Sequence, residues 1–205
     1  MSLFSNLIDN LIDNLHGSNK VEGLAKSFAH LGWIGFWSQV LLGSIPLVVT
    51  LYIFVFTGNL TGPRSGLPIV AFLTLANLAA LIFTIFWFWR YPALAKRIAD
   101  PVARPSETAI LRTVWTGLVA STLGILFSMA VLILDVGQLL MYFLTAPQAG
   151  IPAIQTTAGL QASWVSAIDL LSLLALLLML AAEVLALVLG LWLMFRTTQT
   201  AGELV

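Results

Sequence analysis

The sequence predicts an all-α membrane protein, a bundle of four transmembrane helices preceded by an amphipathic helix at the N-terminus. Hydrophobic residues make up 60% of the chain and charged residues only 9%, with a mean hydropathy of +1.00. In a soluble domain about 25% of the residues are charged. Four stretches are long and apolar enough to cross a bilayer. Lys and Arg are concentrated in the segments that would lie on one side of it.

Residues 1–30 form an N-terminal segment that opens with an amphipathic pattern. Apolar residues recur at helical spacing from Leu3 to Leu15. Because this stretch contains Asp9 and Asp13 but no Lys or Arg, attraction to anionic lipid headgroups cannot hold it on a membrane. Two interpretations stay open. The helix either packs on the membrane surface or on its own bundle, or it docks a partner protein.

Residues 31–196 are predicted to form the transmembrane bundle, and residues 197–205 a short C-terminal tail. A helix needs about 20 apolar residues to cross the hydrocarbon core. Pro68 suits the first turn of the second span. Ser106, in the stretch "PSET", resembles a helix N-cap ahead of the third span. The predicted spans cover residues 32–56, 68–89, 113–135 and 164–195.

Basic residues predict how the four spans are oriented, because cytoplasmic segments carry an excess of Lys and Arg. Of the nine basic residues, only Arg64 falls between the first and second spans or between the third and fourth. The others precede the first span, connect the second to the third, or follow the fourth. We therefore expect both termini on the cytoplasmic side. These residues are Lys20, Lys26, Arg90, Lys96, Arg97, Arg104, Arg112 and Arg196.

Small residues recur along one face of the third span and one face of the fourth. Small side chains let helix backbones approach closely, which is how helices associate in lipid. We expect these faces to form contacts within the bundle or between two copies of the chain, in preference to lining a pore. The residues are Gly117, Ser121, Gly124 and Ser128 on the third span, and Ala182, Ala186 and Gly190 on the fourth.

Asp135 and Asp169 are predicted at the outer ends of the third and fourth spans. Arg64 is the only base on that side of the membrane. One interpretation is structural: either an aspartate snorkels to the membrane interface, or an ion pair between Arg64 and a carboxylate holds the first loop against the bundle. The other is a vestibule that attracts cations, because carboxylate oxygens are ligands for hard cations. The spacing by itself specifies no particular metal.

Glu183 is predicted close to the middle of the bilayer. It shares a helix face with Asp169, since fourteen residues make nearly four turns. An ionised carboxylate at this depth costs several kcal/mol, and no base lies nearby, so we expect Glu183 to be protonated or paired. Asn77, near the middle of the second span, is a candidate partner of Glu183. With Glu183, Asp169 and Asp135 it is also a candidate to contact a transported cation. Glu183 is then either a hydrogen-bonded link between helices or a relay point for a proton or cation.

Several classes of function have no support in the sequence. The absence of cysteine excludes disulfides, thiolate metal sites and cysteine nucleophiles. We recognise no nucleophile–base pair, no Gly-rich phosphate loop and no pair of catalytic carboxylates, so we expect neither enzymatic activity nor a cofactor. A net charge of zero provides no field to attract nucleic acid. The expected partners are the lipid bilayer and other membrane-embedded helices.

Three stretches carry a family resemblance: "LGWIGFWSQV" (31–40), "FWFWRYPALAKRIAD" (86–100) and "SAIDLL" (166–171). Together they resemble a four-span family of the chloroplast inner envelope that has cyanobacterial relatives. This family is described both as the permease in chloroplasts and as the 21-kDa subunit of the inner-envelope translocon. The resemblance implies either iron transport or a role in protein import. Asp169 matches an acidic position of the family, whereas Glu183 does not match the plant proteins.

Two functions of different classes follow. The first, favoured by the resemblance, is transport of iron or another divalent cation. Four spans are few for a transport path, so a homo-oligomer is expected. The second is a non-transporting scaffold, assembly factor or translocation accessory subunit, bound to a larger complex through its small-residue faces and N-terminal helix. In the absence of a long transit peptide, we expect a multi-pass protein of a cyanobacterial plasma or thylakoid membrane.

Overall fold

The computed structural model describes the backbone of residues 2–57, 68–145 and 167–200, and the side chains of residues 20–52, 69–141, 144 and 170–200. No β-strand occurs in these backbone ranges, so the predicted all-α class is confirmed. The helices, in chain order, are α1 (Ser2–Thr57), α2 (Pro68–Ala99), α3 (Glu107–Thr145) and α4 (Ala167–Thr200).

Each of the four helices is long and apolar enough to cross a membrane, which confirms the predicted number of spans. Long, nearly uniform apolar surfaces are what lipid-facing helices require, since no water is present to solvate polar side chains there. The apolar stretches are Lys20–Tyr52, Ile69–Ala99, Glu107–Met141 and Leu170–Thr200.

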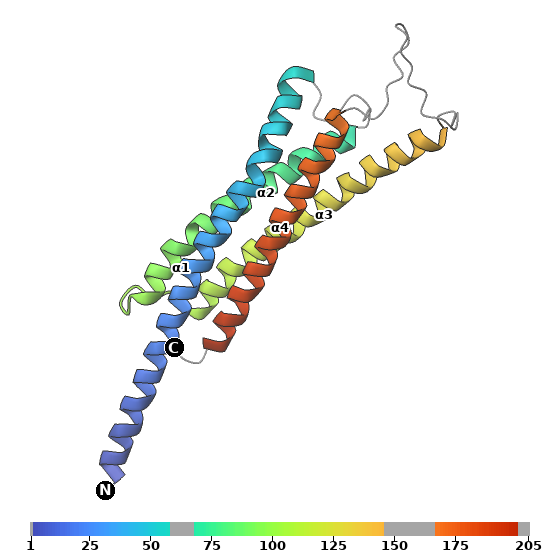
Figure 1. Ribbon diagram of the computed structural model, residues 1–205. Helices are drawn as coiled ribbons and strands as arrows, with labels where there is room; N and C mark the ends of the chain where they lie inside the picture. Colours follow the sequence, from blue (N-terminus) through green and yellow to red (C-terminus); the bar gives the residue numbers. More distant parts are fainter. Residues whose placement is uncertain (1, 58–67, 146–166, 201–205) are drawn as a thin grey trace.

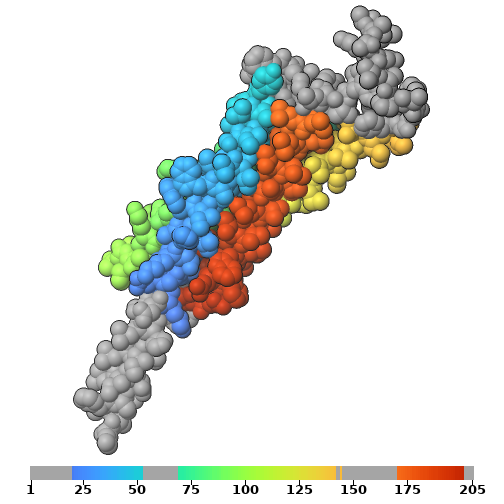
Figure 2. Space-filling view, in the orientation of Figure 1, coloured from blue at the N-terminus to red at the C-terminus, as the bar shows by residue number. Residues whose placement is uncertain are grey.

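The helices run up and down alternately to form a bundle (Figure 1). α1 packs against α2 and α4, and α3 packs against the same two helices from the other side. Figure 2 shows α1 and α4 side by side over the length of one face. Both termini and the α2–α3 connection lie at one end of the bundle, which we call the termini end (Figure 1). The opposite end, where α1 and α3 finish, is the loop end.

The connection between α2 and α3 is shorter than the sequence predicts. α2 continues beyond the predicted span, through Pro92 to Ala99, and α3 begins at Glu107. The extension is helical because Ala95 and Ile98 share one face and pack into the core, while Lys96 and Arg97 stay exposed.

The predicted N-cap of α3 is confirmed. Ser106 precedes the helix, and its hydroxyl accepts a hydrogen bond from the amide of Ala109 at 3.4 Å. Its backbone carbonyl accepts from Ala109 and Ile110 at 3.0 and 3.1 Å. A side-chain acceptor at this position satisfies one of the amide groups that the first turn of a helix leaves unpaired.

Residues 3–15 are helical, as predicted, but the helix does not end before the first span. α1 runs without interruption from Ser2 to Thr57, and its first turns extend past the termini end along the helix axis (Figure 1). The reason is that no proline lies between Leu15 and the span, and an isolated glycine such as Gly17 or Gly23 costs a helix only about 1 kcal/mol.

The termini half of the bundle is filled by large apolar side chains. Tyr91 lies at the centre, with its ring 5.8 Å from Phe28 and 4.9 Å from Phe88 in edge-to-face arrangements. Such pairs add about 0.5–1.5 kcal/mol to the burial of the rings. The buried cluster also contains Val21, Leu24, Ala25, Ala95, Ile98, Ile110, Val114, Leu118, Ala186 and Leu193.

α1 also has a face of small residues, which the sequence analysis did not single out. Gly32, Gly35 and Gly43 are buried against α2. A Cβ atom on Gly32 would lie 2.7 Å from Cβ of Tyr91, and one on Gly43 would lie 3.1 Å from a methyl of Leu81. α1 therefore approaches α2 too closely for a larger side chain at these positions.

Candidate functional site

Glu183 lies in the interior of the bundle, where α4 faces α2 and α3. Its side chain is fully buried. The Thr84 hydroxyl of α2 donates a hydrogen bond to Oε1 of Glu183 at 3.1 Å. On the α3 side, the carboxyl rests on the backbone of Gly124, where a Cβ atom would come within 2.7 Å of Cδ of Glu183. The absence of a side chain at Gly124 is what makes room for the carboxyl.

The Glu183 carboxyl is only partly satisfied. The hydroxyl of Ser121, three residues before Gly124 on α3, lies close enough to interact with the carboxyl. Oε2 of Glu183 nevertheless has no hydrogen-bond partner among the described residues, although it is buried. A buried oxygen without a partner costs about 1–3 kcal/mol, so such an atom calls for a functional explanation.

Gln39 of α1 is the second buried group of this kind, and it is not among the site residues predicted from the sequence. Its side chain is fully buried, and neither Nε2 nor Oε1 has a hydrogen-bond partner among the described residues. A lone amide in the middle of an apolar span, four residues from Gly35 and from Gly43, was the available signal. That spacing places Gln39 on the small-residue face of α1.

The contacts of Gly35 and Gly43 show at what height along the bundle axis Gln39 lies. Phe88 fills the space beside Gly35, and Leu81 the space beside Gly43. Gln39 lies midway between the glycines, so it faces α2 midway between Leu81 and Phe88, at the level of Thr84. Leu189 of α4 also borders Gly35. α4 runs antiparallel to α1. A step of one helical turn along α1, from Gly35 to Gln39, therefore corresponds to a step along α4 from Leu189 towards Glu183.

One polar side chain from each helix therefore lies at this level. Thr84 is the central residue of its apolar stretch, and each of the other three lies within about 5 Å of the centre of its own, at 1.5 Å per residue. All are buried, with exposed fractions of 0–1%. We call this set the central oxygen layer; it consists of Gln39, Thr84, Ser121 and Glu183.

Asn77 belongs to a separate polar contact and does not bond Glu183. Its amide nitrogen donates to Sδ of Met179 at 3.2 Å, and its carbonyl accepts from the Ser128 hydroxyl at 2.9 Å. Asn77 lies seven residues from Thr84 on α2, and Ser128 lies seven residues from Ser121 on α3. Each is therefore about 10 Å from the central oxygen layer, towards the loop end. This contact joins α2, α3 and α4, as interhelical hydrogen bonds in membranes do.

The small residues of α3 and α4 all face the interior. The Cβ position of Gly117 is closed by Tyr91 and Trp87, and that of Gly190 by Leu118. The remaining members, Ser121, Gly124, Ser128, Ala182 and Ala186, are buried as well. In this structure, these faces serve the contacts within one bundle.

The predicted outer acidic site is only partly within the described residues. Asp135 is half-buried near the loop end of α3. The side chain of Asp169 and the whole of Arg64 lie outside the described residues, so the predicted vestibule and ion pair stay predictions. Among the side chains that the structure describes, no group of three or more His, Asp or Glu residues could hold a metal ion.

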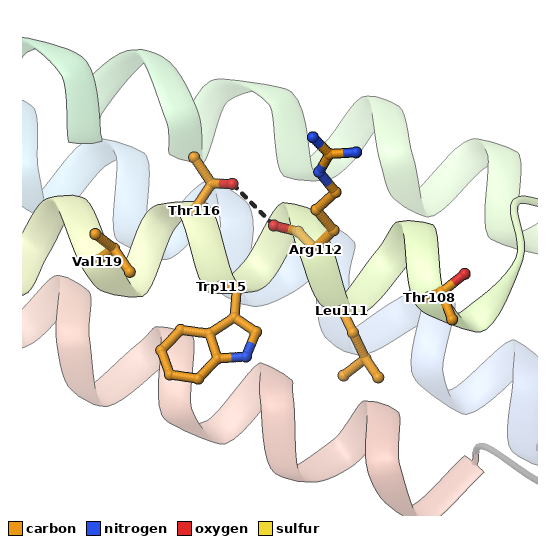
Figure 3. Close-up of a pocket in the computed structure, with 6 residues that line it drawn as sticks. All are labelled: Thr108, Leu111, Arg112, Trp115, Thr116 and Val119. Atoms are coloured by element: carbon orange, nitrogen blue, oxygen red, sulfur yellow. Dashed lines mark hydrogen bonds between the residues drawn. The ribbon is translucent and has the colours of Figure 1, made fainter.

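An open groove of about 510 Å³ lies on the surface of α3 (Figure 3). Its lining includes no member of the central oxygen layer. All of its lining residues belong to α3, and the Thr116 hydroxyl in it donates to the carbonyl of Arg112 at 2.9 Å. The groove contains no carboxylate, so it offers a cation no charged ligand. It is lined by Thr108, Leu111, Arg112, Trp115, Thr116 and Val119.

Comparison with known proteins agrees with the resemblance read from the sequence. The chain is 26% identical to Protein TIC 21, chloroplastic, of Arabidopsis thaliana over 111 residues, which is 52% of this chain and 36% of that protein. The match thus spans about a third of the relative's length. No solved structure matches the chain significantly. The family model described as "Protein of unknown function (DUF3611)" matches residues 18–198, nearly the whole four-helix bundle, and the chain therefore belongs to this family of membrane proteins.

Proposed function

We propose that this chain moves a cation across the bilayer, and that Glu183 is the group that meets the ion at mid-membrane. The supporting observation is the unpartnered Oε2 of a fully buried carboxyl. A carboxyl that served only to link helices would have both oxygens paired, as both polar atoms of the Asn77 amide are. Placing an ionisable residue inside a membrane costs free energy, and residues of this kind typically mark ion or proton pathways.

The resemblance supports iron or another divalent cation as the transported species. Divalent sites usually combine several charged ligands. Glu183 is the only carboxylate in the central oxygen layer. Binding of a divalent metal would therefore need Asp135 or Asp169 nearer the loop end, or ligands from a second copy in a homo-oligomer.

We propose that the eight basic residues of the termini end lie on the cytoplasmic side of a cyanobacterial plasma or thylakoid membrane, because cytoplasmic segments carry an excess of Lys and Arg.

The test is cation uptake into proteoliposomes that contain the purified chain, with Fe²⁺, Mn²⁺, Na⁺ and K⁺ as separate substrates. We expect Glu183→Gln to lower uptake at least about tenfold, because loss of a charged ligand costs about 1.5–3 kcal/mol. The matched control is Glu22→Gln, since Glu22 is exposed and pairs with Lys26 at 2.7 Å away from the bundle centre. Equal uptake by the wild type and Glu183→Gln contradicts the proposal.

A scaffold or assembly role in a larger membrane complex is the second candidate, and the extension of α1 past the termini end supports it. Deletion of residues 1–17 separates the two functions. Transport predicts that uptake is retained, because the central oxygen layer is intact in the shortened chain. The scaffold role predicts that a partner co-purifying from native membranes in mild detergent is lost. Loss of uptake by a folded, shortened chain would show that the bundle alone does not transport.

A further inference from the structure

We propose that the central oxygen layer binds one singly charged alkali cation, in exchange for the proton of Glu183. This deepens the proposed function and rests on it, because it names the class of ion that the bundle centre accepts. The inference starts from three buried polar atoms without partners: Nε2 and Oε1 of Gln39 and Oε2 of Glu183. They lie at one level of the bundle, on helices that pack against each other.

Charge balance favours a bound ion with a single positive charge. Glu183 is the only Asp, Glu, Lys, Arg or His within residues 31–52, 70–89, 113–134 and 170–195. A charge that is not neutralised in an apolar interior costs many kcal/mol. The ionised carboxylate is neutralised by one proton or by one monovalent cation. A divalent cation would leave one positive charge without a counter-charge in the core.

The donor atoms suit a hard, weakly charged ion. Selective sites for alkali cations in membranes replace water with carbonyl and other oxygen ligands. Here the carbonyl of Gln39, the hydroxyls of Thr84 and Ser121, and the carboxylate supply such oxygens from all four helices. The Thr84 hydroxyl lies 3.0 Å from the carbonyl of Leu81 and 3.1 Å from Glu183, so it can direct its proton to Leu81 and its lone pairs to the ion.

The exchange conserves charge and involves no oxidation or reduction. The carboxylic acid of Glu183 loses its proton to the solution as the cation enters, and the carboxylate retains the cation. Among the side chains that the structure describes on α1, α2 and α3, no carboxylate, histidine or basic group lies in the central oxygen layer beside Glu183. On α2, the ionisable residues nearest to Thr84 in the sequence are Arg90, whose side chain is exposed, and the buried Tyr91, six and seven residues away towards the termini end. Cation binding in the layer and the accompanying proton release can therefore both be assigned to Glu183.

The expected role of Gln39 is to present its carbonyl oxygen to the bound ion. Gln39 bonds nothing else among the described residues, so replacing it with leucine removes a ligand without breaking a link between helices. Leucine has a similar volume and suits an apolar interior. This makes Gln39→Leu a test of ligand binding that keeps the fold. Gln199→Leu is the matched control, because Gln199 is exposed near the end of α4.

The experiment measures proton release from the purified full chain in weakly buffered detergent solution when NaCl, KCl or choline chloride is added. We expect release of about one proton per chain with Na⁺ or K⁺ and none with choline, since one carboxyl titrates. Glu183→Gln should release none. Gln39→Leu should need at least about tenfold more cation for half-maximal release, as expected for one lost ligand, while Gln39→Asn and Gln199→Leu should be less affected.

Three results would overturn the inference. These are proton release with Mn²⁺ but not with Na⁺ or K⁺, cation binding without proton release, and a Gln39→Leu response equal to that of the wild type. If Glu183-dependent uptake of a divalent ion persists in proteoliposomes, only the single-charge site is wrong and the proposed transport stands. If the protein neither binds nor moves a cation of either charge, both proposals are wrong.

Discussion

Replacing Gly35 with alanine is expected to destabilise the bundle by about 1–3 kcal/mol, the usual cost of overpacking a filled interior. The added Cβ would overlap the ring of Phe88, which is 2% exposed, and would lie 3.2 Å from a methyl of Leu189. Phe88 cannot turn away without cost, because its ring packs edge-to-face on Tyr91. Gly35→Leu should be worse and should separate α1 from α2.

The measurement is the temperature at which the detergent-solubilised chain loses its monodisperse peak in size-exclusion chromatography. Gly23→Ala on the same helix is the control, because nothing lies within 4 Å of the Cβ position of Gly23. Alanine there should stabilise the helix by about 0.5–1 kcal/mol relative to glycine. A Gly35→Ala chain as stable as Gly23→Ala would mean that α1 and α2 are not packed as closely as described.

Gly124→Ala is expected to weaken the proposed cation binding and uptake at Glu183 strongly while the bundle stays folded. The new Cβ would lie 2.7 Å from Cδ and 2.8 Å from Cγ of Glu183, so the carboxyl must move. Its hydrogen bond with Thr84 would then be lost or lengthened. We expect uptake, and proton release by added cation, to fall at least about tenfold, because one hydrogen bond to a charged group contributes about 1.5–3 kcal/mol.

A compensating substitution makes this prediction specific. Aspartate is one methylene shorter than glutamate, so Glu183→Asp should partly restore function in the Gly124→Ala chain while impairing it in the wild-type chain. The four proteins form a double-mutant cycle, and residues in contact typically give interaction energies of about 0.5–3 kcal/mol. Gly137→Ala is the control on α3, since its Cβ would meet nothing within 4 Å. Additive effects of Gly124→Ala and Glu183→Asp would contradict direct contact.

Two features of the structure differ from what the sequence predicts, for a common reason. The sequence places residue 90 onwards in the connection to the third span because charges interrupt the apolar run there, yet α2 continues to Ala99 because Ala95 and Ile98 pack into the core. The sequence also predicts Asn77 as a partner of Glu183, because both are polar and lie deep in the membrane. The structure pairs Asn77 with Ser128 and Met179 instead, about two helical turns from Thr84. Hydropathy reports depth in the membrane, but not the direction in which a side chain points.

The four spans, the N-cap of α3 and the depth of Glu183 could all be obtained from the sequence. Each depends on local chemistry, because the length of an apolar run and the position of a capping residue do not depend on the partner helices. The partners of Glu183 depend instead on how each helix is rotated about its own axis. That rotation follows from steric fit at surfaces such as the glycine face of α1 against α2, so only the folded bundle could bring Gln39 and Thr84 to the level of the carboxyl.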